Sequence, residues 1–287
     1  MTDGIETLGD MVCLLGEGPL WDPREQALYW TDIEGHRIHR RDPTSGEGQS
    51  FEMPCEVGCI ALRQRGGFVL ATRWGFALWQ PGGPLEYIGD PEADKPDARF
   101  NDGAVDRAGR FWAGTYGQSY DSALYRLDPD RTIRRMVSGV DIANGIGWDP
   151  ANRTLYFTDS TPRKIYAFDF DLASGAIENR RVFVDSSDEP GVPDGLAVDR
   201  DGFVWSVRWG GWCIQRYDPA GKLERVIRLP VEFPTSCAFG GEALDELFVT
   251  SASSPVKKGN PAHQPFAGRV LRLDPGVRGL PEPEFLG

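Results

Sequence analysis

The sequence lacks long apolar runs and an excess of basic residues. No stretch approaches the roughly 18 consecutive apolar residues that cross a bilayer, and the first residues, MTDGIETLGD, contain no apolar core of a secretory leader. Lys and Arg number 31 against 43 Asp and Glu, a net charge of −12. Such a chain repels phosphate backbones and anionic lipid. We therefore expect neither a nucleic-acid partner nor a membrane partner.

Cysteine and histidine are scarce, and common enzyme motifs are absent. Five cysteines, an odd number without zinc spacing, predict buried free thiols and a reducing cytoplasm rather than a disulfide framework. His36 and His39 are three apart on an expected outer strand, which predicts surface side chains. No G-x-S-x-G, G-x-G-x-x-G or G-K-[ST] occurs, so a serine-hydrolase elbow, a dinucleotide fold and a P-loop lack support.

Turn-forming residues are abundant instead. Gly (35) and Pro (22) make up 57 of the 287 residues, about a fifth, whereas average usage of the two is roughly 12%. Hydrophobic residues at 40% and charged residues at 26% are typical of a folded chain. The composition therefore predicts many short strands joined by tight turns and argues against long helices.

An internal repeat sets the expected fold. Four segments share a polar residue, a glycine and a closing Asp that opens a type I turn; they begin at Glu17, Asn101, Asn144 and Asp194. Weaker copies begin at Val57 and Thr235. A strand-like run rich in aromatic and β-branched residues follows each turn, for example ALYWT at 27–31 and TLYFT at 154–158.

The spacing of the repeats predicts a propeller. Successive first positions are 40, 44, 43, 50 and 41 residues apart, the period of a four-stranded propeller blade. We expect one all-β domain over residues 1–287, a six-bladed β-propeller; a two-sheet sandwich is the alternative. The tail GVRGLPEPEFLG is too rich in Pro and Gly for a last strand, so we expect the N-terminal segment Met11–Leu15 to close the sixth blade. A closed ring needs no partner edge, which favours a monomer.

The first repeat positions form a candidate metal site. They begin the innermost strands, so they should point to one mouth of the central channel; in order they are Glu17, Val57, Asn101, Asn144, Asp194 and Thr235. Buried carboxylates need a counter-charge, and no Lys or Arg occupies these positions. Carboxylate and amide oxygens favour Ca²⁺, Mg²⁺ or Mn²⁺ and also accept Zn²⁺ or Fe²⁺. The alternative is that Asn144-Gly145 and Asp194-Gly195 are only turns and that Glu17 is only a cap.

Several motifs together resemble a known family. Gly16-Glu-Gly-Pro19, Arg99-Phe-Asn-Asp-Gly103, Asn144-Gly145 and Pro193-Asp-Gly195 are similar to those of the senescence-marker/gluconolactonase/luciferin-regenerating family, the regucalcin relatives. The resemblance covers nearly the whole chain. It implies a six-bladed propeller with one divalent cation, and in many members hydrolysis of sugar lactones to aldonic acids.

The resemblance also implies roles for individual residues. Glu17, Asn144 and Asp194 correspond to metal ligands, with Asp194 also the general base, and Arg99 and Asn101 correspond to substrate contacts. Some relatives carry an acidic substrate contact after the pair matching Gly114-Thr115, whereas this chain has none at that place. Gln118 or Tyr120 is the expected replacement, in a 116–121 loop that is a candidate lid, and His263 lies in a loop that is a candidate for the channel rim.

The expected function is therefore hydrolysis of a sugar lactone by a metal-dependent, gluconolactonase-like enzyme, with a small-molecule sugar lactone as its partner. Two alternatives remain open. One is a phosphotriesterase-like or other esterase that uses the same metal, and the other is a non-catalytic calcium-binding propeller. Neither the particular sugar nor the particular cation follows from these residues.

Overall fold

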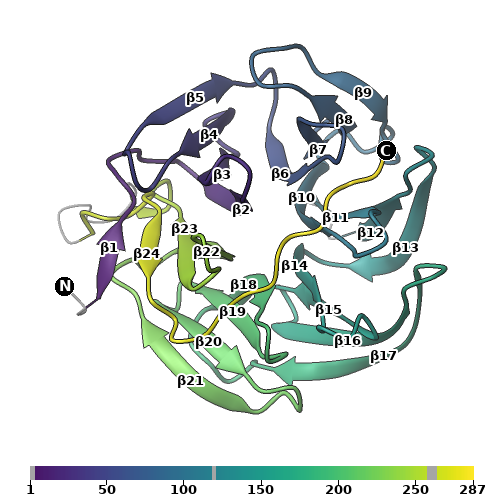
Figure 1. The fold of residues 1–287 in the computed structure, drawn as a ribbon. Helices are drawn as coiled ribbons and strands as arrows, with labels where there is room; N and C mark the ends of the chain where they lie inside the picture. The colour runs from purple at the N-terminus through teal and green to yellow at the C-terminus, as the bar shows by residue number, and fades with distance from the viewer. Residues whose placement is uncertain (1–3, 118–120, 257–263) are drawn as a thin grey trace.

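The protein is a ring of β-sheets around a central axis (Figure 1). The computed structural model describes residues 4–117, 121–256 and 264–287. Within these ranges the strands form six four-stranded antiparallel sheets, each a blade of the ring. The six-bladed β-propeller predicted from the repeat is confirmed.

Each of the first five blades uses four consecutive strands, with the first strand innermost. Their bounds are β2 Gly16–Asp22, β3 Ala27–Asp32, β4 Arg37–Arg41 and β5 Gly48–Glu52 in blade 1; β6 Val57–Leu62, β7 Phe68–Thr72, β8 Gly75–Trp79 and β9 Glu86–Gly89 in blade 2; β10 Arg99–Val105, β11 Phe111–Tyr116, β12 Ser122–Leu127 and β13 Ile133–Val140 in blade 3; β14 Ala143–Trp148, β15 Thr154–Asp159, β16 Lys164–Asp171 and β17 Ala176–Asp185 in blade 4; and β18 Val192–Val198, β19 Val204–Trp209, β20 Cys213–Tyr217 and β21 Leu223–Arg228 in blade 5.

The sixth blade joins the two ends of the chain. It consists of β22 Pro234–Gly240, β23 Glu246–Ser251, β24 Leu271–Leu273 and, as its outermost strand, β1 Ile5–Thr7. Ile5 pairs with Leu273 and Thr7 with Leu271. Closure by the N-terminal segment is thus confirmed, but its assignment to Met11–Leu15 was wrong. Those residues lie between β1 and β2 and form no strand of the blade; Cys13 is buried between blades 1 and 6, so this apolar run packs as a crossing segment.

The burial pattern follows the radial order of the strands. Second strands such as β3 and β7 are buried along their whole length, whereas outer strands such as β5 and β21 are mostly exposed. The Asp that closes each inner strand opens the turn as expected: Asp106 accepts hydrogen bonds from the backbone N–H of Ala108 and Gly109 at 2.9 and 2.8 Å. Hydrophobic clusters then fill the spaces between neighbouring blades.

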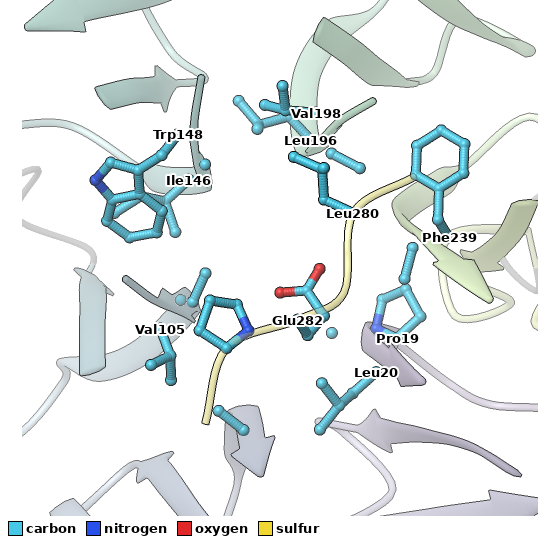
Figure 2. A pocket seen from close by; sticks show the side chains of 18 of the residues that line it. Pro19, Leu20, Val105, Ile146, Trp148, Leu196, Val198, Phe239, Leu280 and Glu282 are labelled. Carbon is cyan, nitrogen blue, oxygen red and sulfur yellow. The ribbon is translucent and has the colours of Figure 1, made fainter. Parts of the chain in front are cut away.

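The C-terminal segment crosses one mouth of the channel (Figure 1). All six inner strands and residues 280–283 enclose a cavity of about 110 Å³, which has room for water molecules. Figure 2 shows the Glu282 carboxylate in the middle of this cavity, among Leu20, Ile146 and Leu196. As expected, the Pro- and Gly-rich tail forms no strand of the last blade.

Two further expectations concern cysteine and histidine. All five cysteines are buried and free, as predicted. His36 is partly exposed on a turn, but His39 is buried, so the expectation of a surface side chain was wrong for His39. Its ring packs on Trp30 with a centroid separation of 5.2 Å, because this face of β4 is covered by the segment between β1 and β2. No helix in the described ranges is both long and apolar enough to cross a membrane.

Candidate metal centre and active site

A β-bulge marks the candidate position in every blade. One extra residue interrupts the pairing of each inner strand with its neighbour, between Glu17 and Leu20 in β2, Ala143 and Ile146 in β14, and Pro193 and Leu196 in β18, with counterparts in β6, β10 and β22. Bulges bend a strand and re-aim its side chains. The repeat therefore places Glu17, Asn144 and Asp194 at equivalent points of the inner strands of blades 1, 4 and 5, where their exposures are 6, 6 and 5%.

Glycines after these residues let the inner strands approach closely. A Cβ atom on Gly145 would lie 2.5 Å from the backbone nitrogen of Leu196 and 2.8 Å from the carbonyl oxygen of Asp194. A Cβ atom on Gly195 would lie 2.2 Å from Ser236 Oγ. The Asn-Gly and Asp-Gly pairs therefore belong to strands in contact rather than to turns, and the alternative that they are only turns was wrong.

Three carboxyl groups share this region of the channel. Burial, followed by the negative charges of Asp194 and Asp102, raises the pKa of Glu17 well above its usual range. Burial and the charge of Asp102 do the same to the pKa of Asp194. Burial also raises the pKa of Asp102 to about 6. Without a cation, the three groups therefore oppose one another's ionisation.

The donor set fits a divalent cation. Asp194 Oδ1 is buried and has no hydrogen-bond partner among the described residues, an expensive state for a carboxylate oxygen. Glu17 and Asp194 form no ion pair within that part of the chain, although Arg99 lies near enough to lower the pKa of both. A cation that accepts oxygen ligands would give Asp194 Oδ1 a partner and would offset the repulsion among the buried carboxylates.

A chain of hydrogen bonds orients the amide of Asn144. Arg99 Nη1 donates to Asn101 Oδ1 at 2.6 Å, and Asn101 Nδ2 donates to Asn144 Oδ1 at 2.7 Å and to the carbonyl oxygen of Ala143 at 2.8 Å. Because a guanidinium only donates, the orientation of the Asn101 amide follows from Arg99. That orientation in turn places Asn144 Oδ1 toward Asn101.

The same chain continues to the strand of Asp194. Asn144 Nδ2 donates to Ser160 Oγ at 2.7 Å, and the Ser160 hydroxyl donates to the carbonyl oxygen of Pro193 at 2.6 Å. The single hydroxyl proton is committed to a carbonyl, so the serine oxygen accepts from Asn144. Both ends of the chain therefore require the same orientation of the Asn144 amide, and Ser160 links this residue to the backbone beside Asp194.

The predicted substrate contacts divide into three groups. Arg99 Nη1 is used by Asn101 and by the carbonyl oxygen of Phe100, and the guanidinium lies over the Tyr116 ring at 5.0 Å. Both amide hydrogens of Asn101 are used within the protein, which leaves only a lone pair of Oδ1 for substrate. Gln118 and Tyr120 lie outside the described residues, as does His263, the candidate for the channel rim.

The remaining first positions do not add ligands. Val57 is buried and apolar. Thr235 Oγ1 is occupied by the carbonyl oxygen of Gly16 at 2.5 Å and by Thr250 Oγ1 at 2.8 Å. The oxygen-rich side chains are therefore concentrated on the inner strands of blades 1, 3, 4 and 5.

The sequence analysis missed two residues of the site. Asp102 follows Asn101 in the bulge of β10, lines the channel and acts electrostatically on Glu17 and Asp194. Ser160 follows β15 directly; its blade 1 counterpart is Ile33, because Ser160 and Ile33 both donate a backbone N–H to the segment before the inner strand. Comparing the repeats at this position would have singled out the hydroxyl.

The fold and these side chains define a class of protein: six-bladed propellers whose inner strands carry buried carboxylates and amides. The profile of the SMP-30/Gluconolactonase/LRE-like region matches residues 15–253. This match covers most of the chain, and the protein belongs to that family.

Relatives span essentially the whole chain. Regucalcin of Gallus gallus is 37% identical, with 99% of this chain and 98% of the relative covered. Pentonolactonase XacC of Haloferax volcanii is 38% identical, with 95% of each covered. Among solved structures, a calcium-binding protein, regucalcin, of Agrobacterium tumefaciens superposes with a TM-score of 0.93 at 27% identity, covering 99% of this chain and 97% of that one.

Proposed function

We propose that Glu17, Asn144 and Asp194 hold one divalent cation and that the protein uses it to hydrolyse a sugar lactone to the aldonic acid. The buried Asp194 Oδ1 without a hydrogen-bond partner among the described residues is the observation that carries the proposal. The raised pKa values of Glu17 and Asp194 support it, because the nearby Arg99 only partly offsets burial and the charge of Asp102. The relatives named regucalcin and pentonolactonase support the reaction class.

The protein's own residues have distinct tasks in this reaction. When bound, a divalent cation supplies a Lewis acid that polarises a lactone carbonyl and makes a neighbouring water molecule more acidic. Asp194 has two carboxylate oxygens, so one can hold the cation while the other accepts the proton of the attacking water. The water oxygen then bonds to the carbonyl carbon, the ring C–O bond breaks, and the proton passes from Asp194 to the leaving ring oxygen, which becomes a hydroxyl group.

Arg99 is the proposed substrate-orienting residue. Its Nη1 is held by Phe100 and Asn101, whereas Nε and Nη2 have no hydrogen-bond partner among the described residues. These N–H groups suit the hydroxyl or carbonyl oxygens of a sugar lactone. The Tyr116 ring beneath the guanidinium fixes its plane. Gln118 and Tyr120 stay as proposed contacts from the neighbouring loop.

A lactone panel tests the reaction. Chelator-stripped protein is refilled with Ca²⁺, Mg²⁺, Mn²⁺, Zn²⁺ or Fe²⁺, and acid release from hexono- and pentonolactones is followed at pH about 7 with spontaneous opening subtracted. We expect turnover only with metal, and a loss of about 10²-fold or more in Asp194→Asn, the range of general-base contributions.

Glu282→Gln is the matched control, since Glu282 lies in the same channel on the C-terminal segment. It should keep full activity. Metal binding without turnover of any lactone would contradict the lactonase proposal and favour either another ester substrate or a binding role. We further propose that residues 1–287 act as one monomeric domain in the cytoplasm, for which light scattering of the purified protein tests the oligomeric state.

A further inference from the structure

A second group of metal-binding side chains lies outside the channel. Cys13 is in the segment between β1 and β2, Asp32 ends β3, and His39 is in the middle of β4. Their exposures are 1, 3 and 6%, and each offers a donor atom within 4.8 Å of the other two. Thiolate, carboxylate and imidazole are the three donor types that zinc accepts from proteins.

Each of these side chains is held in place by a further contact. The Trp30 Nε1–H group lies 3.2 Å from Cys13 Sγ, and Ser50 Oγ lies 2.7 Å from His39 Nδ1. With Nδ1 engaged by Ser50, Nε2 is the ring nitrogen left for a ligand. Metal-binding histidines are commonly fixed through their other nitrogen in this way.

Asp32 is anchored by the backbone. Its Oδ1 accepts from the N–H groups of Leu15 and Gly35 at 3.0 and 3.1 Å, and its Oδ2 accepts from the N–H of Leu14 at 3.1 Å. A carboxylate has about four lone-pair positions, so one on Oδ2 remains available. The neighbouring Arg37 pairs with Glu52 at 2.7 Å and forms no ion pair with Asp32 among the described residues.

Blade 4 shows that the anchoring role of Asp32 does not require the other two residues. Asp159 accepts from the N–H groups of Asp141 and Ile142 at 3.2 and 3.1 Å, just as Asp32 holds the segment before its own blade. The position equivalent to Cys13 is Val140, which directly precedes Asp141.

The position equivalent to His39 also differs in blade 4. His39 is paired with Trp30 across β3 and β4, and Tyr166 is paired with Phe157 at the same point of blade 4. Blade 4 thus has the carboxylate, Asp159, without a thiol or an imidazole beside it. Only the blade 1 copy adds a thiol and an imidazole to it, so these two residues need an explanation beyond backbone anchoring.

We propose that Cys13, Asp32 and His39 bind a zinc ion, with a water molecule as the fourth ligand. The thiol gives up its proton to solvent on binding, so each bound ion releases one proton. Because Cys13 lies between the strand that closes blade 6 and the first strand of blade 1, the ion ties the ring closure to blade 1. The site is independent of the channel centre, whose side-chain donors are all oxygens.

Cobalt titration of the whole protein tests this site. Co²⁺ bound to a thiolate has a sulfur-to-metal charge-transfer band in the near ultraviolet, whereas Co²⁺ held only by oxygen has none. We expect this band in the wild type, its removal by excess Zn²⁺ and by Cys13→Ser, and at least about tenfold weaker binding in His39→Gln. Cys213→Ser, a buried thiol of β20 in blade 5, is the control and should keep the band.

Two results would overturn the proposal: no band in folded wild-type protein, or a band that survives in Cys13→Ser. If the variants do not fold, X-ray absorption of the zinc-loaded wild type decides the question without mutation. A sulfur neighbour at about 2.3 Å is the expected result. A zinc environment of oxygen and nitrogen alone would refute the site.

Discussion

Asn144 Nδ2 donates a 2.7 Å hydrogen bond to Ser160 Oγ, and the contacts of both residues with other residues fix which of the two is the donor. The Ser160 proton is committed to the Pro193 carbonyl oxygen, and Asn144 Oδ1 is committed to Asn101. The amide of Asn144, a proposed metal ligand, therefore cannot flip without breaking its hydrogen bonds to Asn101 and to Ser160. This arrangement connects the geometry of Asn144 to the backbone that carries Asp194.

We predict that Ser160→Ala weakens metal binding by about 10- to 100-fold, the usual effect of removing a partner that orients a ligand. Isothermal calorimetry on chelator-stripped protein measures the affinity. Ser206→Ala is the matched control, because Ser206 is also buried but its Oγ has no hydrogen-bond partner among the described residues. Equal affinities in wild type and Ser160→Ala would contradict the orienting role.

Asp194→Asn should raise the stability of the metal-free protein although it lowers the activity. The substitution removes a buried charge that Asp102 opposes, so the metal-free variant should unfold at a higher temperature than the metal-free wild type. The stabilisation by added metal should shrink or vanish, because a ligand is lost. Thermal unfolding with chelator and with metal checks both parts. A metal-free variant less stable than the wild type would argue against carboxylate repulsion in the channel.

The stability of the metal-free protein should depend on pH in a defined direction. Glu17, Asp102 and Asp194 have higher pKa values folded than unfolded, so between these values the folded state binds more protons. The free energy of unfolding then falls as pH rises from about 4, the ordinary carboxyl pKa, through about 6, where Asp102 titrates, and beyond.

Denaturant unfolding from pH 4.5 to 8, with chelator and with saturating metal, isolates this effect. Carboxyl groups elsewhere contribute equally to both series, and the site contributes a decline only without metal. Parallel curves for the two series would show that the three carboxyl groups are not coupled to the cation.

Removal of residues 1–8 should open the ring. It deletes β1, which pairs with β24, together with the buried Leu8, and leaves an unpaired strand edge in blade 6. We expect a lower melting temperature and concentration-dependent association, measured by calorimetry and light scattering. Removal of residues 1–3 alone is the control and should change neither property.

Most of the fold was predicted from the internal repeat, because six copies of one turn motif locate each inner strand within a residue or two. The closing strand was misplaced for a physical reason. Met11–Leu15 is more apolar than Ile5–Thr7, and hydrophobicity alone does not distinguish a buried crossing segment from an edge strand, which is held by backbone pairing with β24.

Only those candidate site residues that occupy the same position in several repeats were predictable from the sequence. Glu17, Asn144 and Asp194 occupy one repeat position and could therefore be singled out as candidate ligands. Ser160 acts across the boundary between two blades, so no motif within one repeat contains it. The burial of His39 depends on the segment between β1 and β2, which local spacing does not reveal.

Stepwise addition of Mn²⁺ to chelator-stripped protein tests the central claim most directly. Mn²⁺ prefers oxygen ligands over thiolate, so it reports on the channel centre. Bound Mn²⁺ is followed by electron paramagnetic resonance, and hydrolysis of the best lactone is followed in the same samples. We predict that the rate rises in proportion to bound Mn²⁺ and stops rising at one ion per chain. Full turnover by stripped protein, or one bound ion without turnover, would contradict the account.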